Sequence, residues 1–128
     1  MAVEIIKTDK APGAVGPYSQ AIKAGDFLFA SGQIAINPEK GKLVGGGVEA
    51  QAEQCMKNVG AILEAAGLTY DDVVKTTVYL TNISFFGTVN GVYGKYFQKT
   101  LPARSCVEIG QLPLGAFVEV EVVAYCGK

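Results

Sequence analysis

The sequence predicts an α+β fold in which a mixed six-stranded sheet carries two helices on one face. Six short segments are rich in β-branched and aromatic residues, and two longer segments repeat their apolar residues every three to four positions. Along the chain the order is three strands, a helix, a strand, a second helix and two further strands. Both helices connect strands of the same sheet, and we therefore expect them to form one layer against it.

The first three strands are predicted at residues 3–7, 20–24 and 27–36. Residues 11–18 form a Pro/Gly loop between the first two strands, because proline removes backbone donors and glycine permits unusual dihedral angles. Gly25-Asp26 is a hairpin turn signal between the second and third strands.

The first helix follows a polar loop that begins at residue 37 and includes three consecutive glycines. From Val48 to Ala66 the apolar residues recur at helical spacing, and Gly67 stands where a C-cap glycine is expected. Residues 73–81 alternate and are rich in β-branched residues, and they are therefore predicted as the fourth strand.

Ser84 can cap the second predicted helix. The apolar face of this helix carries Phe86, Val89, Tyr93 and Phe97. Three glycines, Gly87, Gly91 and Gly94, lie beside that face. Each glycine costs roughly 1 kcal/mol of helix propensity against alanine, and close backbone packing is therefore expected there.

The last two strands are predicted at residues 104–109 and 117–125. Alternation along the final strand places Val118, Val120 and Val122 on one face and Glu119, Glu121 and Val123 on the other. The segment 27–30 is apolar on both faces, which half-solvated strands rarely are. Two helices cover only one face, and a second copy of the chain is expected to cover part of the other.

The length of 128 residues predicts a single domain, 1–128. Eleven Lys and Arg against twelve Asp and Glu give a net charge of −1, which leaves no basic field for nucleic acid or an anionic membrane. No apolar stretch reaches the roughly 18 residues of a membrane span, and no signal peptide pattern is visible. The three cysteines are odd in number and widely spaced, which favours reduced thiols and a cytoplasmic location.

The chain has no histidine. This excludes Ser-His-Asp and Cys-His catalytic groups, an imidazole base and a His-ligated zinc. The glycine runs match no nucleotide-binding fingerprint. Any chemistry must therefore rest on carboxylates, Arg, Lys, Tyr, hydroxyls, Cys and backbone groups.

Arg104, Cys106 and Glu119 are the first candidates for a site. An arginine on a strand presents a planar fork that suits a carboxylate. A glutamate facing the same space either pairs with that arginine as a structural ion pair or holds and deprotonates a water. Cys106 is either a nucleophile whose thiolate Arg104 favours or a small packed strand residue.

Two further segments carry weaker signals. Tyr18 and Ser19 follow a Gly-Pro pair and are either turn residues or part of a site. Ser31 and Gly32 interrupt an apolar strand, which is typical of a bulge or of a close approach of the backbone to a ligand.

Seven segments together resemble the RidA/YjgF family of reactive-intermediate deaminases. They cover nearly the whole chain in order: GPYSQA (16–21), SGQI (31–34), NVGAILEAAG (58–67), VVKTTVYL (73–80), VNGVYGKYF (89–97), PARSCVE (102–108) and VEVEVVA (118–124). PARSCVE is the most specific of them. One departure is Phe85, which stands where relatives usually carry a polar or acidic residue.

The resemblance implies a chorismate-mutase-like protomer, a homotrimer with sites between subunits, and hydrolysis of 2-imino acids to 2-oxo acids and ammonia. It implies that Arg104 grips the substrate carboxylate and that Glu119 positions the attacking water. Backbone groups of Gly32 and Cys106 would assist, and Tyr18, Ser31 and Asn90 would line the cleft. No metal and no organic cofactor is implied.

Two rival functions remain open. Some members of the family are described as translation inhibitors with ribonuclease activity, against which the net charge of −1 and the missing basic stripe argue. The other rival is a non-catalytic trimer that binds small carboxylates or partner proteins. Relatives without the arginine belong to that class, whereas this chain keeps Arg104 and Glu119.

Overall fold

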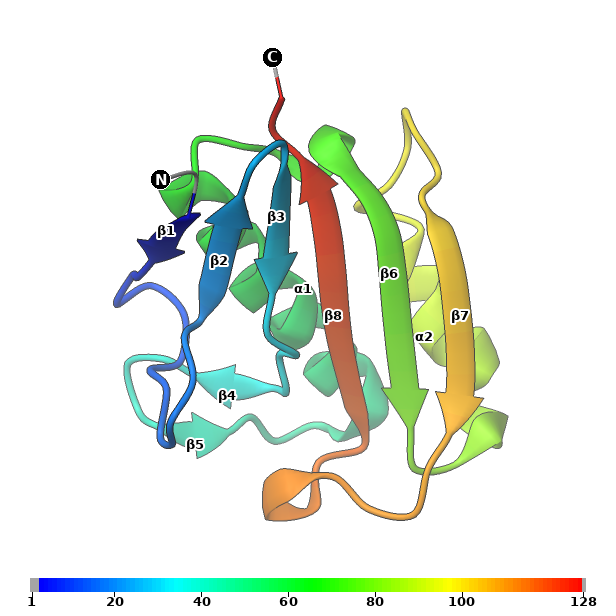
Figure 1. Ribbon diagram of the computed structural model, residues 1–128. Helices are drawn as coiled ribbons and strands as arrows, with labels where there is room; N and C mark the ends of the chain where they lie inside the picture. Colours follow the sequence, from blue (N-terminus) through cyan, green and yellow to red (C-terminus); the bar gives the residue numbers. More distant parts are fainter. Residues whose placement is uncertain (1–2, 128) are drawn as a thin grey trace.

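The computed structural model describes residues 3–127, which form a six-stranded sheet backed by two helices (Figure 1). The strands lie in the order β1-β2-β3-β8-β6-β7, and only the β6–β7 pair is parallel. The sheet strands are β1 (Val3–Ile6), β2 (Ala21–Ala24), β3 (Phe27–Ala30), β6 (Val73–Leu80), β7 (Ala103–Glu108) and β8 (Val118–Tyr125). The helices are α1 (Gly47–Ala65) and α2 (Phe86–Tyr93), with short 3-10 turns at Tyr70–Asp72, Ile83–Phe85 and Pro113–Gly115. The predicted fold class is confirmed.

The predicted hairpin between the second and third strands is confirmed. Ala24 pairs with Phe27 across the turn, and Gly25 adopts a positive φ of 59°. The third strand, however, is shorter than predicted. It ends at Ala30, because the chain turns away at Ser31-Gly32 and rejoins the sheet only through a single bridge between Gln33 and Val120.

The predicted polar loop contains a small hairpin that the sequence did not reveal. β4 (Ile36–Asn37) pairs with β5 (Lys42–Leu43) outside the main sheet. Asn37 closes its turn by accepting backbone hydrogen bonds from Glu39 and Lys40 at 2.9 and 3.3 Å. Strands of two residues are too short to show a period, and for this reason the pattern did not predict them.

Helix α1 ends as the sequence predicts. Gly67 has a φ of 77°, and its N–H donates to the carbonyl of Glu64, while Leu68 N–H donates to Leu63. This pair of bonds is a Schellman motif, in which a left-handed glycine satisfies the last carbonyls of a helix. One face of α1, including Cys55, Met56, Val59 and Ile62, is buried in the core.

Helix α2 differs from the prediction at both ends. Asn82, and not Ser84, caps the preceding turn, because its side chain accepts from the Ser84 N–H at 2.9 Å. The helix itself ends at Tyr93, and Phe97 reaches the core from the segment beyond it. The 3-10 turn before α2 and the early end shorten the helix to eight residues.

The expectation of close backbone packing at the glycines of α2 is wrong for this protomer. A Cβ added at Gly87 or Gly91 would meet no atom within 4 Å, and one at Gly94 would meet only the carbonyl oxygen of Asn90 on the same helix. The glycine stripe therefore faces away from the core.

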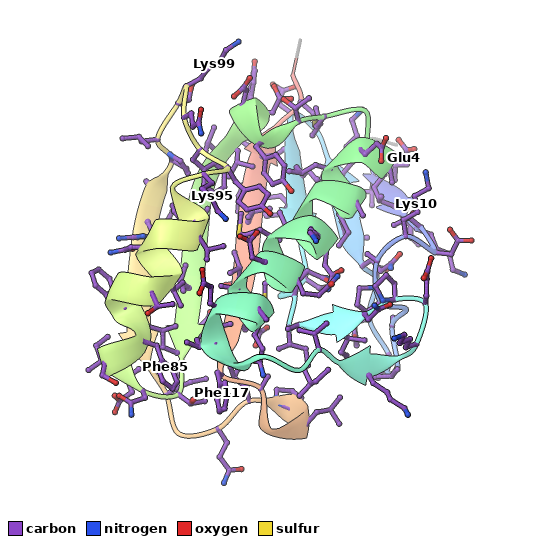
Figure 2. The ribbon with its side chains drawn as sticks, turned by 180° about the vertical axis from the view of Figure 1, so that it is seen from behind. Glu4, Lys10, Phe85, Lys95, Lys99 and Phe117 are labelled. Carbon is purple, nitrogen blue, oxygen red and sulfur yellow. The ribbon has the colours of Figure 1, made fainter. Side chains whose placement is uncertain are left out.

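The two faces of the sheet differ in their cover. Both helices lie behind the sheet in Figure 1, and Figure 2 shows them side by side from behind. Val78, Val118, Val120 and Val122 face the helices and are buried. The opposite face is bare and carries Phe27, Phe29 and Tyr125 at 40%, 50% and 38% exposure. The predicted uncovered apolar face is therefore present in the protomer.

Phe85, the residue that departs from the family pattern, packs away from the candidate site. Its ring lies 5.4 Å from the ring of Phe117, at the end of the molecule where α2 begins (Figure 2).

None of the helices within residues 3–127 combines the length and apolar character that crossing a membrane requires.

Candidate active site

The break after β3 brings the backbone of Gly32 against Glu119. The Ser31 N–H donates to Gln20 O at 2.9 Å and its hydroxyl donates to Ser19 O at 2.6 Å, so Ser31 stays bonded to the segment before β2. At Gly32 any Cβ would overlap the carboxylate of Glu119 on β8. Gly32 therefore permits this close approach of backbone and side chain, as its position in an interrupted strand suggests.

Glu119 is a half-buried carboxylate on the bare face of the sheet. Burial raises its pKa above the ordinary value, and the neighbouring Glu121 raises it further. Glu121 in turn accepts a hydrogen bond from the Tyr79 hydroxyl at 2.9 Å. A carboxylate whose ionised form is poorly solvated is a better proton acceptor than one in open water, which is the property that a general base needs.

Tyr18 lies in the loop that precedes β2, and this loop is held by Gln20. The buried Gln20 amide accepts from Thr8 N–H at 2.8 Å and donates to the carbonyls of Thr8 and Pro12 at 3.0 and 2.8 Å. A hollow of about 900 Å³ runs along the N-terminal segment and is lined by Tyr18 and Ser19, among others. Neither Glu119 nor Arg104 lines this hollow, and we do not assign the reacting groups to it.

Tyr18, Ser31, Gly32 and Glu119 form what we call the loop half of the site. Ser31 and Gly32 are consecutive, Gly32 contacts Glu119, and Ser31 is bonded to the residue after Tyr18. The structure thus brings Ser31, Gly32 and Glu119 together, and Tyr18 is next in the chain to Ser19, whose carbonyl accepts from Ser31.

Asn90, Arg104 and Cys106 form a second group, the edge half, on β7 and α2. Arg104 Nη1 donates to Asn90 Oδ1 at 2.7 Å. The Arg104 guanidinium carbon lies 4.9 Å from the ring centre of Tyr93 and 5.4 Å from that of Phe86. Arg104 is exposed, and within residues 3–127 no carboxylate forms an ion pair with it. Most of its N–H donors are therefore free for a ligand.

The side chain of Cys106 is a poor candidate for a nucleophile. It is partly buried, and burial raises the pKa of its thiol although Arg104 acts in the opposite direction. Its backbone is better placed. Ile109 N–H donates to Leu80 O at 2.8 Å, and alternation along a strand then directs the backbone groups of Cys106 to the open edge of the sheet.

We expect Cys106→Ala to retain most of the activity, because the substitution leaves the backbone groups in place and removes only a protonated thiol. Steady-state turnover of the variant, measured beside the wild type, checks this. A loss as deep as that of Arg104→Ala would show that the thiol takes part in the reaction.

The structure does not bring Arg104 and Glu119 together within one protomer. β6 lies between β7 and β8, so the two residues are two strand spacings, roughly 10 Å, apart across the sheet, and their partners on β6 are a further three positions apart along it. They also face opposite sides, because Arg104 is in register with Thr76 and Glu119 with Tyr79 on the same strand. The expectation that they face a common space is wrong for the protomer, and so is the alternative that they form a structural ion pair.

Sequence reasoning assigned Phe86 and Tyr93 to the core and missed their contact with Arg104. The signal was present in their spacing, because Phe86, Asn90 and Tyr93 stand at i, i+4 and i+7 and must share one face of α2. It could not be interpreted without knowing that β7 lies beside α2.

The fold and the two half-sites define a small α+β protein with a YjgF-like fold. A family model described as Endoribonuclease L-PSP matches residues 8–126. The chain belongs to this family, the RidA/YjgF family, which confirms the predicted resemblance. It is 48% identical to a mouse protein named 2-iminobutanoate/2-iminopropanoate deaminase, over 97% of this chain and 92% of the relative. The human protein of the same name is 49% identical, over 96% and 90% of the two chains.

Solved structures agree with the fold. A Yersinia pestis protein of the conserved Rid family, YyfA, superposes with a TM-score of 0.94 at 51% identity and covers 97% of this chain and 99% of its own. The Escherichia coli protein TdcF, solved with bound serine, superposes with a TM-score of 0.91 at 42% identity, over 95% and 98% of the two chains.

Proposed function

We propose that this protein hydrolyses 2-imino acids such as 2-iminopropanoate and 2-iminobutanoate to 2-oxo acids and ammonia. The mouse and human relatives bear the name of this activity. The observation that carries the proposal is the exposed guanidinium of Arg104, which is held by Asn90 and has no carboxylate partner among residues 3–127. A planar fork with free donors is suited to the α-carboxylate that all 2-imino acids share.

The reaction requires the protein to orient the imino acid and to supply one general base. In the proposed step, a water held by Glu119 attacks the carbon of the protonated imine, and its proton passes to the Glu119 carboxylate. That proton then returns to the nitrogen. The C–N bond breaks and releases ammonia as the hydroxyl proton passes to the Glu119 carboxylate and the carbonyl forms. Water is the only co-reactant, and the step therefore needs no metal and no organic cofactor.

We propose further that the loop half of one protomer meets the edge half of its neighbour in a homotrimer. Two features support this. The halves lie on opposite faces of one sheet, so a small imino acid cannot reach both in a single protomer. The bare face also exposes large apolar side chains, which a symmetric assembly would cover. Each of the three sites would then contain residues of two chains.

We place the protein in the cytoplasm, because its cysteines form no disulfide. Cys55, Cys106 and Cys126 are all free in the structure, as expected in a reducing compartment.

The experiment that tests the proposed function is turnover of a freshly generated imine. An amino acid oxidase acting on alanine supplies 2-iminopropanoate in the cuvette, and release of ammonia is followed with and without the protein. We expect the protein to accelerate release well above the spontaneous rate. If the rate stays at the spontaneous value while the protein binds pyruvate, the non-catalytic function replaces the enzyme.

A further inference from the structure

Three side chains on one face of α2 contact the guanidinium of Arg104. Phe86, Asn90 and Tyr93 are spaced by four and three residues and therefore stand in line on the helix. Asn90 accepts the hydrogen bond from Nη1 at 2.7 Å. The rings of Phe86 and Tyr93 lie 5.4 and 4.9 Å from the guanidinium carbon, within the range of cation–π contact.

Of the two rings, Tyr93 is the one that is fixed. Its hydroxyl is 2.7 Å from the hydroxyl of Thr76, a fully buried residue on β6. Its ring also packs on Phe97, with the centres 4.7 Å apart. Phe86 is 39% exposed, and no aromatic ring within residues 3–127 pairs with its ring. Thr76 stands in register with Arg104 on the neighbouring strand, so the anchor is set directly beside the strand that carries the arginine.

Arg104 stands at a position where a long side chain is expected to be mobile unless other side chains hold it. β7 is an edge strand with a single neighbour, and Arg104 is exposed on it. A long side chain on an exposed edge samples many rotamers, and a ligand that needs one of them must bear the loss of rotamer freedom. A ring and an amide that already hold the guanidinium reduce this loss.

We propose that Tyr93 is a positioning residue for Arg104, whose ring holds the guanidinium in the orientation that binds the carboxylate of the substrate. Thr76 fixes that ring through its hydroxyl. This inference rests on the proposed role of Arg104 in carboxylate binding. It assigns a role in substrate affinity to a residue that burial alone would place in the core.

The test compares Tyr93→Leu, which removes the ring, with Tyr93→Phe, which keeps it. Pyruvate is the probe, and its Kd is measured by calorimetry in parallel with the KM for 2-iminopropanoate. From typical strengths of exposed cation–π contacts, Tyr93→Leu should raise the Kd and the KM about twofold to fivefold. Tyr93→Phe keeps the face of the ring and loses the hydrogen bond that fixes it to Thr76, so it should raise both by less than Tyr93→Leu does.

The matched control is Val89→Ala, which removes core packing from the same helix. Val89 is buried and makes no contact with the guanidinium comparable to those of Phe86, Asn90 and Tyr93. This variant should lose thermal stability and keep the wild-type Kd. A wild-type Kd in Tyr93→Leu, or an equal loss of affinity in Val89→Ala, would overturn the positioning role.

Pyruvate binding needs no turnover, and the two proposals can therefore fail separately. Suppose that the wild type does not hydrolyse the imine but binds pyruvate, and that Tyr93→Leu weakens this binding. The proposed function is then contradicted and the positioning role is supported. Suppose instead that the wild type hydrolyses the imine and that Tyr93→Leu equals it in activity and in affinity for pyruvate. The proposed function is then supported and the positioning role is contradicted. Failure of the wild type to bind pyruvate would also overturn the positioning role.

Discussion

Arg104→Ala should remove nearly all imine hydrolysis and leave the fold intact. A charge-assisted bidentate contact is worth roughly 1.5–3 kcal/mol, so kcat/KM should fall on the order of 100-fold or more if orientation of the carboxylate supplies most of the catalysis. Arg104 is exposed on an edge strand, and its loss should cost about 1 kcal/mol of stability or less. Imine turnover, pyruvate affinity and melting temperature are measured on the same preparation.

Arg104→Lys is the matched variant, because it keeps the positive charge and loses the planar fork. We expect its affinity for pyruvate and its turnover both to fall, with the melting temperature unchanged. Activity near the wild-type level in either variant would contradict the assignment of Arg104 to the carboxylate.

Glu119→Gln should lower turnover about 100-fold or more, which is the usual contribution of a positioned base. The amide keeps the shape of the side chain and removes its ability to accept the proton of the water. Affinity for pyruvate should change little, because the proposed role of Glu119 is to deprotonate the attacking water, whereas Arg104 binds the carboxylate. Strong loss of affinity together with turnover would assign Glu119 to binding instead.

The raised pKa of Glu119 gives this prediction a pH dependence. Turnover should be full above that pKa and be lost as the pH falls through it, because the protonated carboxyl cannot act as a base. The acid limb of the rate profile should therefore lie above the ordinary range of a glutamate, near 4.3, and should be absent in Glu119→Gln.

The same raised pKa predicts the effect of Glu119→Gln on stability. The ionised form is disfavoured in the fold, so its cost is present above that pKa and disappears as the pH falls through it. Glu119→Gln should thus melt at the wild-type temperature or higher at neutral pH. A lower melting temperature would mean that Glu119 is a structural partner.

Much of the fold could be predicted from the sequence because local signals and tertiary structure agree in most segments. The left-handed Gly25 and Gly67, the period of α1 and the alternation of β8 are all local properties that the structure keeps. The errors lie where elements are short or where tertiary packing decides. The two-residue strands β4 and β5 have no period, and Phe97 reaches the core from outside α2.

The site was predictable as a set of residues and not as an arrangement. Arg104 and Glu119 stand on consecutive strands in the sequence, which suggests neighbours in space. β6 is nevertheless inserted between them, because the connection through α2 makes β7 parallel to β6 and β8 returns on the other side. Sheet order depends on these long-range pairings, and a one-position change of register would exchange the two faces.

The central claim is that each site combines Arg104 of one protomer with Glu119 of its neighbour, and subunit mixing tests it most directly. Arg104→Ala and Glu119→Gln chains are co-expressed with different tags, and hybrid trimers carrying both tags are isolated. In a symmetric ring of three that contains both kinds of chain, one of the three sites has both residues intact. We expect the hybrids to recover activity of that order from two nearly inactive parents. Hybrids no more active than their parents would contradict the claim that the two residues act together in a site shared by neighbouring protomers.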